Sequence, residues 1–144
     1  MGWRVTAYLM VHAGGNPYGL PLADVLEVLE APDIVPVPGA HPALRGVSPV
    51  HGRLVPRVDL AALLAGRAPE GGAPPTIVVV RGAGRTVAFE VDDVDLAMQD
   101  DVLPLPDAWE GPSAVGAARH GDRLVPLLEV GGLLARLETL AEPR

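Results

Sequence analysis

One segment of the sequence occurs twice, and this repetition limits the possible folds more than any other feature. The run His51-Gly52-Arg53-Leu54-Val55-Pro56 returns as His120-Gly121-Asp122-Arg123-Leu124-Val125-Pro126, with one residue inserted at the turn. Three further pairs repeat in the same order, about 70 residues apart: Thr6 and Thr76, Asp24-Val25 and Asp93-Val94, Pro36-Val37-Pro38 and Pro104-Leu105-Pro106. Solenoids need three or more shorter repeats, so two long copies predict two similar lobes packed together.

The pattern within each copy indicates an all-β fold with short helices. Each copy has about five short apolar runs with turn signals between them, which is typical of a small barrel. We therefore expect a first five-stranded barrel over residues 5–66, a Gly-, Pro- and Ala-rich linker over 67–75, and a second barrel over 76–136. A C-terminal helix should run to about residue 140, because leucines recur there at helical spacing.

Individual segments of the first copy differ in how clearly they can be interpreted. His51-Gly52 predicts a tight hairpin turn, since glycine adopts positive φ without steric cost. Residues 24–30 suit either a helix or a strand. We expect one helical turn at 41–45 and a short helix at 60–64.

Composition excludes several classes of protein. Hydrophobic residues make up 49% of the 144 residues and aromatic residues only 3%, so the core must be aliphatic. The net charge of −7 disfavours binding to nucleic acid or to an anionic membrane surface. The absence of cysteine excludes thiolate catalysis and Cys-ligated metals. No apolar run approaches the length of a membrane span, so we expect a cytoplasmic protein without membrane insertion.

The residues that carry chemistry show no catalytic pattern. Gly82-Ala83-Gly84 is followed by a strand pattern, so it predicts a hairpin and not a phosphate loop. The acidic run 92–95 lacks the ligand spacing of a calcium loop and indicates a charged strand edge. No two histidines have helical ligand spacing. We therefore expect no enzyme activity, no cofactor and no metal.

Several motifs resemble those of one known family. The run Gly46-Val47-x-x-x-x-Gly52-x-Leu54-Val55-Pro56-x-Val58-Asp59-Leu60 resembles the signature of the CheW-like domain, a coupling module of bacterial chemotaxis. Further similar motifs are Tyr18-Gly19-Leu20, Val25-Leu26-Glu27-Val28, Val91-Asp92-Asp93-Val94 and Gly121-Asp122-Arg123-Leu124-Val125-Pro126-Leu127-Leu128. Together they cover residues 5–136 in the family's order, so the whole chain of 1–144 is interpreted as a single CheW-like domain.

The resemblance implies a fold, partners and a binding surface. It implies two five-stranded SH3-like β-barrels and a non-catalytic adaptor that couples a CheA-type histidine kinase, through its regulatory domain, to the cytoplasmic tips of chemoreceptors, or a related role in twitching motility. One barrel end would meet the kinase, and a groove between the barrels would take the receptor's helical hairpin. The partner-binding residues implied in this way are Val25, Glu27, Gly46, Val50, His51, Val91 and Val94.

The sequence departs from the family pattern at the central hairpin. The family's Asn-Leu-Arg-Gly is replaced by Pro49-Val50-His51-Gly52, so both the Asn and the Arg are missing. A Glu27–His51 pair is the substitute that we expect, although His51 can equally be a simple hairpin-tip residue. Two other functions stay open: a small-molecule-binding regulatory module that uses the inter-barrel groove, and a metal-dependent enzyme at the aspartate cluster.

Overall fold

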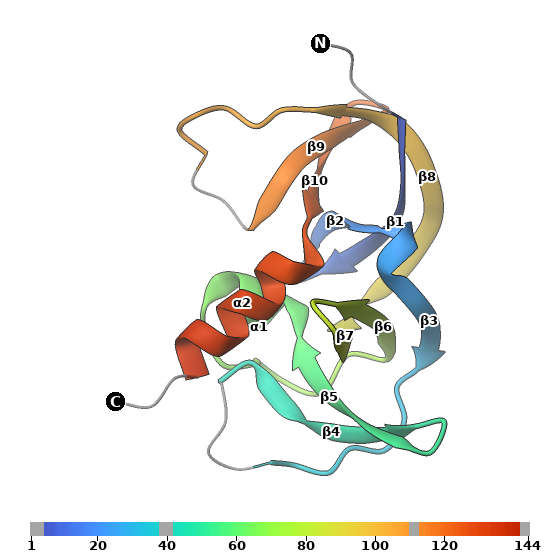
Figure 1. Cartoon of the computed structure of the whole chain (residues 1–144), viewed down its shortest axis with the longest axis vertical. Coiled ribbons are helices and arrows are strands. Elements are labelled where there is room, and N and C mark those ends of the chain that lie inside the picture. Colours follow the sequence, from blue (N-terminus) through green and yellow to red (C-terminus); the bar gives the residue numbers. More distant parts are fainter. Residues whose placement is uncertain (1–4, 38–41, 110–112, 142–144) are drawn as a thin grey trace.

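The protein consists of two β-sheets with two helices between them (Figure 1). The computed structural model describes residues 5–37, 42–109 and 113–141. Its first half contains β1 (Val5–Ala13), β2 (Asn16–Pro21), the 3₁₀ helix η1 (Leu22–Asp24), β3 (Val25–Glu30), β4 (Leu44–Val50), β5 (Arg53–Asp59) and α1 (Leu60–Ala65). Its second half contains β6 (Thr76–Gly82), β7 (Arg85–Val91), β8 (Asp93–Leu103), β9 (Ala114–His120), β10 (Arg123–Leu128) and α2 (Val130–Ala141).

The order of elements repeats as the sequence predicted. Each half has five strands followed by a helix, and residues 67–75 between the halves contain neither a helix nor a strand. The predicted C-terminal helix is confirmed as α2, and the ambiguous segment 24–30 forms β3. The helical turn expected at 41–45 does not form over Leu44 and Arg45, which begin β4, while His41 lies outside the described residues.

The strands are shared between the two sheets in a way that corrects the predicted barrel boundaries. One sheet, which we call lobe A, is a closed barrel with the order β1-β2-β10-β9-β8. The other, lobe B, has the order β3-β6-β7-β5-β4. Each half therefore gives its first hairpin to the sheet formed by the other half, so 5–66 and 76–136 do not form separate barrels. The sequence could not show this exchange, because the two hairpins resemble each other and either one fits either sheet.

The two lobes match in register as well as in strand order. In lobe A the β1–β8 ladder shifts register between Leu9 and Val11, and Val11 pairs with Val94. In lobe B the β3–β6 ladder shifts at the corresponding place, and Val80 pairs with Val25. The β4–β5 and β9–β10 hairpins likewise have their register shifts at corresponding positions. We call two residues equivalent when they hold the same place in these matched ladders.

Lobe B is an open sheet, which corrects the expectation of two closed barrels. In lobe A, β8 runs to Leu103 and pairs with β9. In lobe B, β3 ends at Glu30, two residues before Pro32, and the described part of the following segment pairs with β4 through the isolated bridge between Val35 and Val47. Proline cannot donate a ladder hydrogen bond, so its early position in lobe B shortens the closing strand.

Three apolar clusters fill the molecule. The largest lies between the lobes and joins buried residues of β1 and β2 in lobe A, β6 and β7 in lobe B, and both helices. Smaller clusters fill the interior of lobe A and the concave face of lobe B. The centre of the space between the lobes is thus packed with side chains, and small hollows of about 210 and 190 Å³ remain at its edge, beside Gly14 and Ala61.

The helices are fixed by capping contacts. The Asp59 carboxylate accepts a hydrogen bond from the backbone N–H of Ala62 at the start of α1, and Gly66 ends this helix with φ +70°. The Arg136 guanidinium of α2 donates to the carbonyl oxygens of Leu63 and Leu64 at the C-terminal end of α1. Among the residues that the structure describes, no helix is long and apolar enough to cross a membrane.

Candidate functional site

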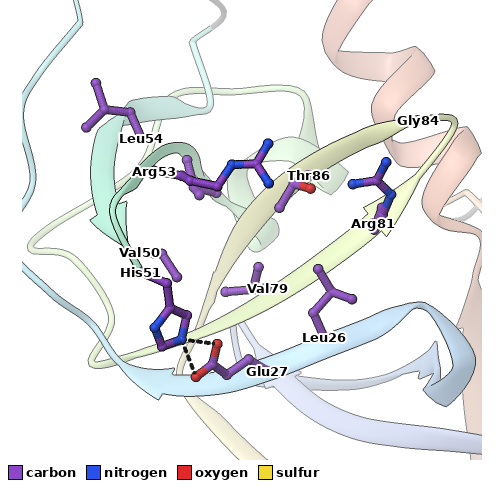
Figure 2. Close-up of a pocket in the computed structure, with 11 residues that line it drawn as sticks. Leu26, Glu27, Val50, His51, Arg53, Leu54, Val79, Arg81, Gly84 and Thr86 are labelled. Atoms are coloured by element: carbon purple, nitrogen blue, oxygen red, sulfur yellow. Dashed lines mark hydrogen bonds and ion pairs between the residues drawn. The ribbon is translucent and has the colours of Figure 1, made fainter.

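A groove of about 410 Å³ opens on lobe B, at the end where its hairpins turn (Figure 2). Residues of β3, of the β4–β5 hairpin and of the β6–β7 hairpin line it. They are Leu26, Glu27, Val50, His51, Arg53, Leu54, Val55, Val79, Arg81, Gly84 and Thr86. Three of the seven residues predicted from the family resemblance, Glu27, Val50 and His51, come together here.

The floor of this groove is apolar and its rim carries exposed leucines. Val50, Val55 and Val79 form the floor and are at most 8% exposed. Leu26 and Leu54 on the rim are 56% and 70% exposed. Two large aliphatic side chains left in water beside an apolar floor are typical of a surface that another molecule covers.

The predicted Glu27–His51 pair is confirmed. His51 Nε2 lies 2.7 Å and 2.9 Å from the two carboxylate oxygens of Glu27 (Figure 2). His51 adopts φ +50° and is followed by Gly52 at φ +79°, so the two residues form the loop of a two-residue hairpin of type I′. This turn directs the imidazole to β3, although its side chain remains 72% exposed. A role of the pair in partner binding stays a prediction.

The two repeated histidines do not hold equivalent positions. Val50 pairs with Arg53 across the first hairpin, whereas His120 pairs with Arg123 across the second. The inserted Asp122 moves the second turn forward, so its loop is Gly121-Asp122 and His120 is the last residue of β9. The equivalent of His120 is therefore Val50, and only the first hairpin has a histidine at its tip.

Two arginines of the groove were not singled out in the sequence. Arg53 opens β5 and Arg81 lies near the end of β6, and both are exposed. Neither side chain makes a hydrogen bond or ion pair within the described part of the chain. Figure 2 shows both guanidinium groups on the side of the groove away from the Glu27–His51 pair. The available sequence signal was an arginine at the end of a strand whose other residues are largely apolar. Because arginine is common at solvated strand ends, this signal does not distinguish a binding residue from an ordinary surface residue.

A buried ionic network elsewhere in lobe B was also missed. Glu90 alternates with apolar residues along β7, yet it is 1% exposed and lies 2.8 Å from Arg57 and 2.6 Å from Arg45. Arg45 also reaches Asp59 at 3.0 Å, and Arg57, 1% exposed, donates to the carbonyl oxygen of Pro32. These contacts link β4, β5 and β7 with the segment after β3. Alternation alone cannot distinguish such a buried carboxylate from a solvated one.

The remaining predicted residues lie away from the groove. Val25 and Val94 are half-buried at the equivalent register shifts of the two lobes and pack against the inter-lobe core. Val91 is fully buried, so it has no surface for a partner. Gly46 is buried where the bridge to Val35 forms, and a Cβ there would collide with the Val35 carbonyl oxygen. Gly46 and Val91 are therefore structural residues of this fold.

The acidic segment shows no arrangement for metal chemistry. Asp92, Asp93 and Asp95 are exposed, and the Asp92 carboxylate accepts a hydrogen bond from the backbone N–H of Gly14. Among the described residues, no three His, Asp or Glu side chains are placed to share a metal ion. The segment therefore gives the metal-dependent alternative no support.

Comparisons with known proteins agree with the fold and the motifs. The model of the CheW-like domain matches residues 7–138. The sequence is 24% identical over 128 residues to a chemotaxis protein CheW of Helicobacter pylori (strain ATCC 700392 / 26695), covering 85% of this chain and 78% of that protein. The structure is similar to that of the scaffolding protein TtCheW from Thermoanaerobacter tengcongensis, with a TM-score of 0.77, 21% identity and 92% of each chain covered. The chain therefore belongs to the CheW-like domain family, as a non-catalytic scaffold of chemotaxis signalling.

Proposed function

We propose that this protein couples a CheA-type histidine kinase to the cytoplasmic tips of chemoreceptors, in chemotaxis or in a related system for twitching motility. The observation that carries the proposal is the match of the CheW-like domain over residues 7–138, nearly the whole chain. The protein would act in the cytoplasm at receptor arrays, by holding two partners side by side.

The groove of lobe B is the proposed docking surface for the regulatory domain of the kinase. It lies at one end of the lobe, and its apolar floor is surrounded by Leu26, Leu54 and charged side chains. An apolar centre with a polar rim is the usual composition of a protein–protein interface. Modest affinity suffices for an adaptor, because many copies in an array act together.

The edge of the inter-lobe core is the proposed contact for the receptor tip. Val25 and Val94 lie there at equivalent positions, and both are only half-buried. Because the space behind them is already packed, a receptor helix would lie across this edge and not enter between the lobes. The proposal therefore gives the two partners separate surfaces on one domain.

Binding measurements with both partners test this function. We expect the full-length protein to bind the regulatory domain of a cognate CheA-type kinase and a receptor-tip fragment at the same time, each with a Kd on the order of 10 µM. Calorimetry on each pair and size-exclusion chromatography of the mixture would measure this. Absence of binding to both partners would refute the coupling function.

A further inference from the structure

We propose that the segment of the kinase regulatory domain which fills the groove presents a carboxylate beside a branched aliphatic side chain. The carboxylate would lie between Arg53 and Arg81, and the aliphatic group would lie on the floor formed by Val50, Val55 and Val79. This inference rests on the proposed function, because it states the chemistry by which that partner is recognised.

The charges in the groove favour an acidic occupant. Arg53 and Arg81 have no partner within the described part of the chain, although the whole chain has 18 acidic residues against 11 basic ones. Among the described residues that line the groove, Glu27 is the only acidic one, and its two carboxylate oxygens already contact His51. The two guanidinium groups are therefore free to bind a carboxylate, which arginine does with paired, directional hydrogen bonds.

The apolar part of the groove favours an aliphatic neighbour for that carboxylate. Its volume of about 410 Å³ accommodates a few side chains of a partner but not a helix-sized body. Leu26 lies beside the buried floor and would cover an aliphatic group on one side, whereas Leu54 points outward from β5 at the edge of the groove (Figure 2). A peptide segment supplies both features at once, whereas an isolated anion would leave the leucines in water.

The equivalent end of lobe A lacks this combination. Arg123 holds the position of Arg53, but His12 holds that of Arg81 and His120 that of Val50. The match at Arg123 gives a control with the same charge change at the same hairpin position. The inference therefore predicts that reversal of charge matters in lobe B and not in lobe A.

Charge-reversal variants in the full-length protein test the inference by calorimetry with the cognate CheA-type regulatory domain. We expect R53E and R81E each to weaken binding about 10-fold and the double variant about 100-fold, since charged hydrogen bonds are lost and like charges meet. The R53K/R81K variant should lose less, because the charge stays and only the paired geometry is lost. R123E should change the affinity less than about 2-fold, as expected for a charge outside the interface.

Each contrary result has a distinct meaning. If the wild-type protein binds the regulatory domain and the double reversal binds equally well, the acidic occupant is refuted while the coupling function stands. If the wild-type protein binds neither partner, the inference fails together with the proposed function. If 4-methylpentanoate alone raises the melting temperature of the wild type but not of R53E/R81E, the groove is a site for a small acid, and the protein-segment proposal is overturned. The affected arginines are exposed, so circular dichroism should show unchanged folding in every variant.

Discussion

Lobes A and B share strand order and register, yet they place their buried polar groups at different positions. In lobe A, the Tyr8 hydroxyl donates to Asp100 at 2.9 Å, and His120 lies 3.7 Å from the same carboxylate. Burial, and then the contact with Asp100, raises the pKa of Tyr8 above its usual range, so its hydroxyl remains a donor. The equivalent positions of lobe B are apolar and hold Ile77, Ala31 and Val50.

Lobe B has its polar network where lobe A is apolar. Arg57 and Glu90 are buried there, and their equivalents in lobe A are Leu127 and Pro21. The comparison teaches that this strand arrangement specifies where side chains meet but not whether they are polar. Of the polar set of lobe A, only His120 has an equivalent in the groove of lobe B, where the apolar Val50 forms part of the floor; Ile77 and Ala31 do not line the groove.

The largest effect should come from breaking the ionic network of lobe B. Glu90→Ala leaves Arg57 buried without its counter-charge, so we expect a loss of about 3–5 kcal/mol in the free energy of unfolding. Urea denaturation would measure it. The double variant R57L/E90L, which makes this layer apolar as in lobe A, should cost less than Glu90→Ala. A loss below about 1 kcal/mol for Glu90→Ala would show that the two lobes do not differ here in energetic terms.

A smaller effect is expected at the equivalent register shifts. Val25→Glu places a charge at a half-buried position against the inter-lobe core, so it should lower the free energy of unfolding by about 1–3 kcal/mol and also weaken receptor binding. Val94→Glu should behave alike if the lobes are equivalent. Leu26→Glu, at the exposed neighbouring position, is the control and should leave stability nearly unchanged. Unequal effects of the two valine variants would break the equivalence.

The polar contact of lobe A should contribute less still. Tyr8→Phe removes the hydrogen bond to Asp100 and should cost about 1 kcal/mol at neutral pH. Because the pKa of Tyr8 is raised in the folded state, the folded protein keeps this proton where the unfolded chain loses it. The wild type should therefore lose stability as pH rises above about 10, and Tyr8→Phe should lose less over that range. Thermal unfolding of both proteins would be measured from pH 8 to 11. If the prediction is wrong, the melting temperatures of the wild type and of Tyr8→Phe will fall in parallel over this range.

The smallest effect should follow from a change at the tip of the β4–β5 hairpin. His51→Asn keeps a residue that tolerates positive φ but removes the contact with Glu27. Exposed ion pairs contribute little, so we expect a change below about 0.5 kcal/mol in the free energy of unfolding. A binding assay with the kinase domain would then report the contribution of the imidazole to recognition, separately from folding.

The sequence predicted the elements of this fold well because its signals are local. The Gly-containing turns, the apolar runs and the leucine spacing of α2 each depend on neighbours along the chain. The exchange of hairpins depends instead on which half of the chain supplies the strands that a hairpin pairs with. Because the two halves have similar sequences, the sequence does not indicate which half that is. The same limit explains Val91, whose motif matched the family but whose side chain is fully buried in the inter-lobe core.

The candidate site was predicted in part for the same reason. The Glu27–His51 contact was predicted from the family resemblance, as a substitute for the family's missing arginine. Arg53 and Arg81 lie on different hairpins, and only the sheet order β6-β7-β5 brings them to one groove. Glu90 alternates with apolar residues as an exposed carboxylate would, and its burial depends on Arg57 and Arg45 arriving from other strands.

The shared hairpins make the two halves of the polypeptide dependent on each other for folding. Neither half carries a complete sheet, so a fragment ending before residue 67 would lack three of the five barrel strands, and also β6 and β7, which pair with its own β3 and β5. A cut within 67–75 would leave two pieces that remain interlocked. The same topology describes a swapped dimer of one ancestral unit, whose two subunits have become one continuous chain.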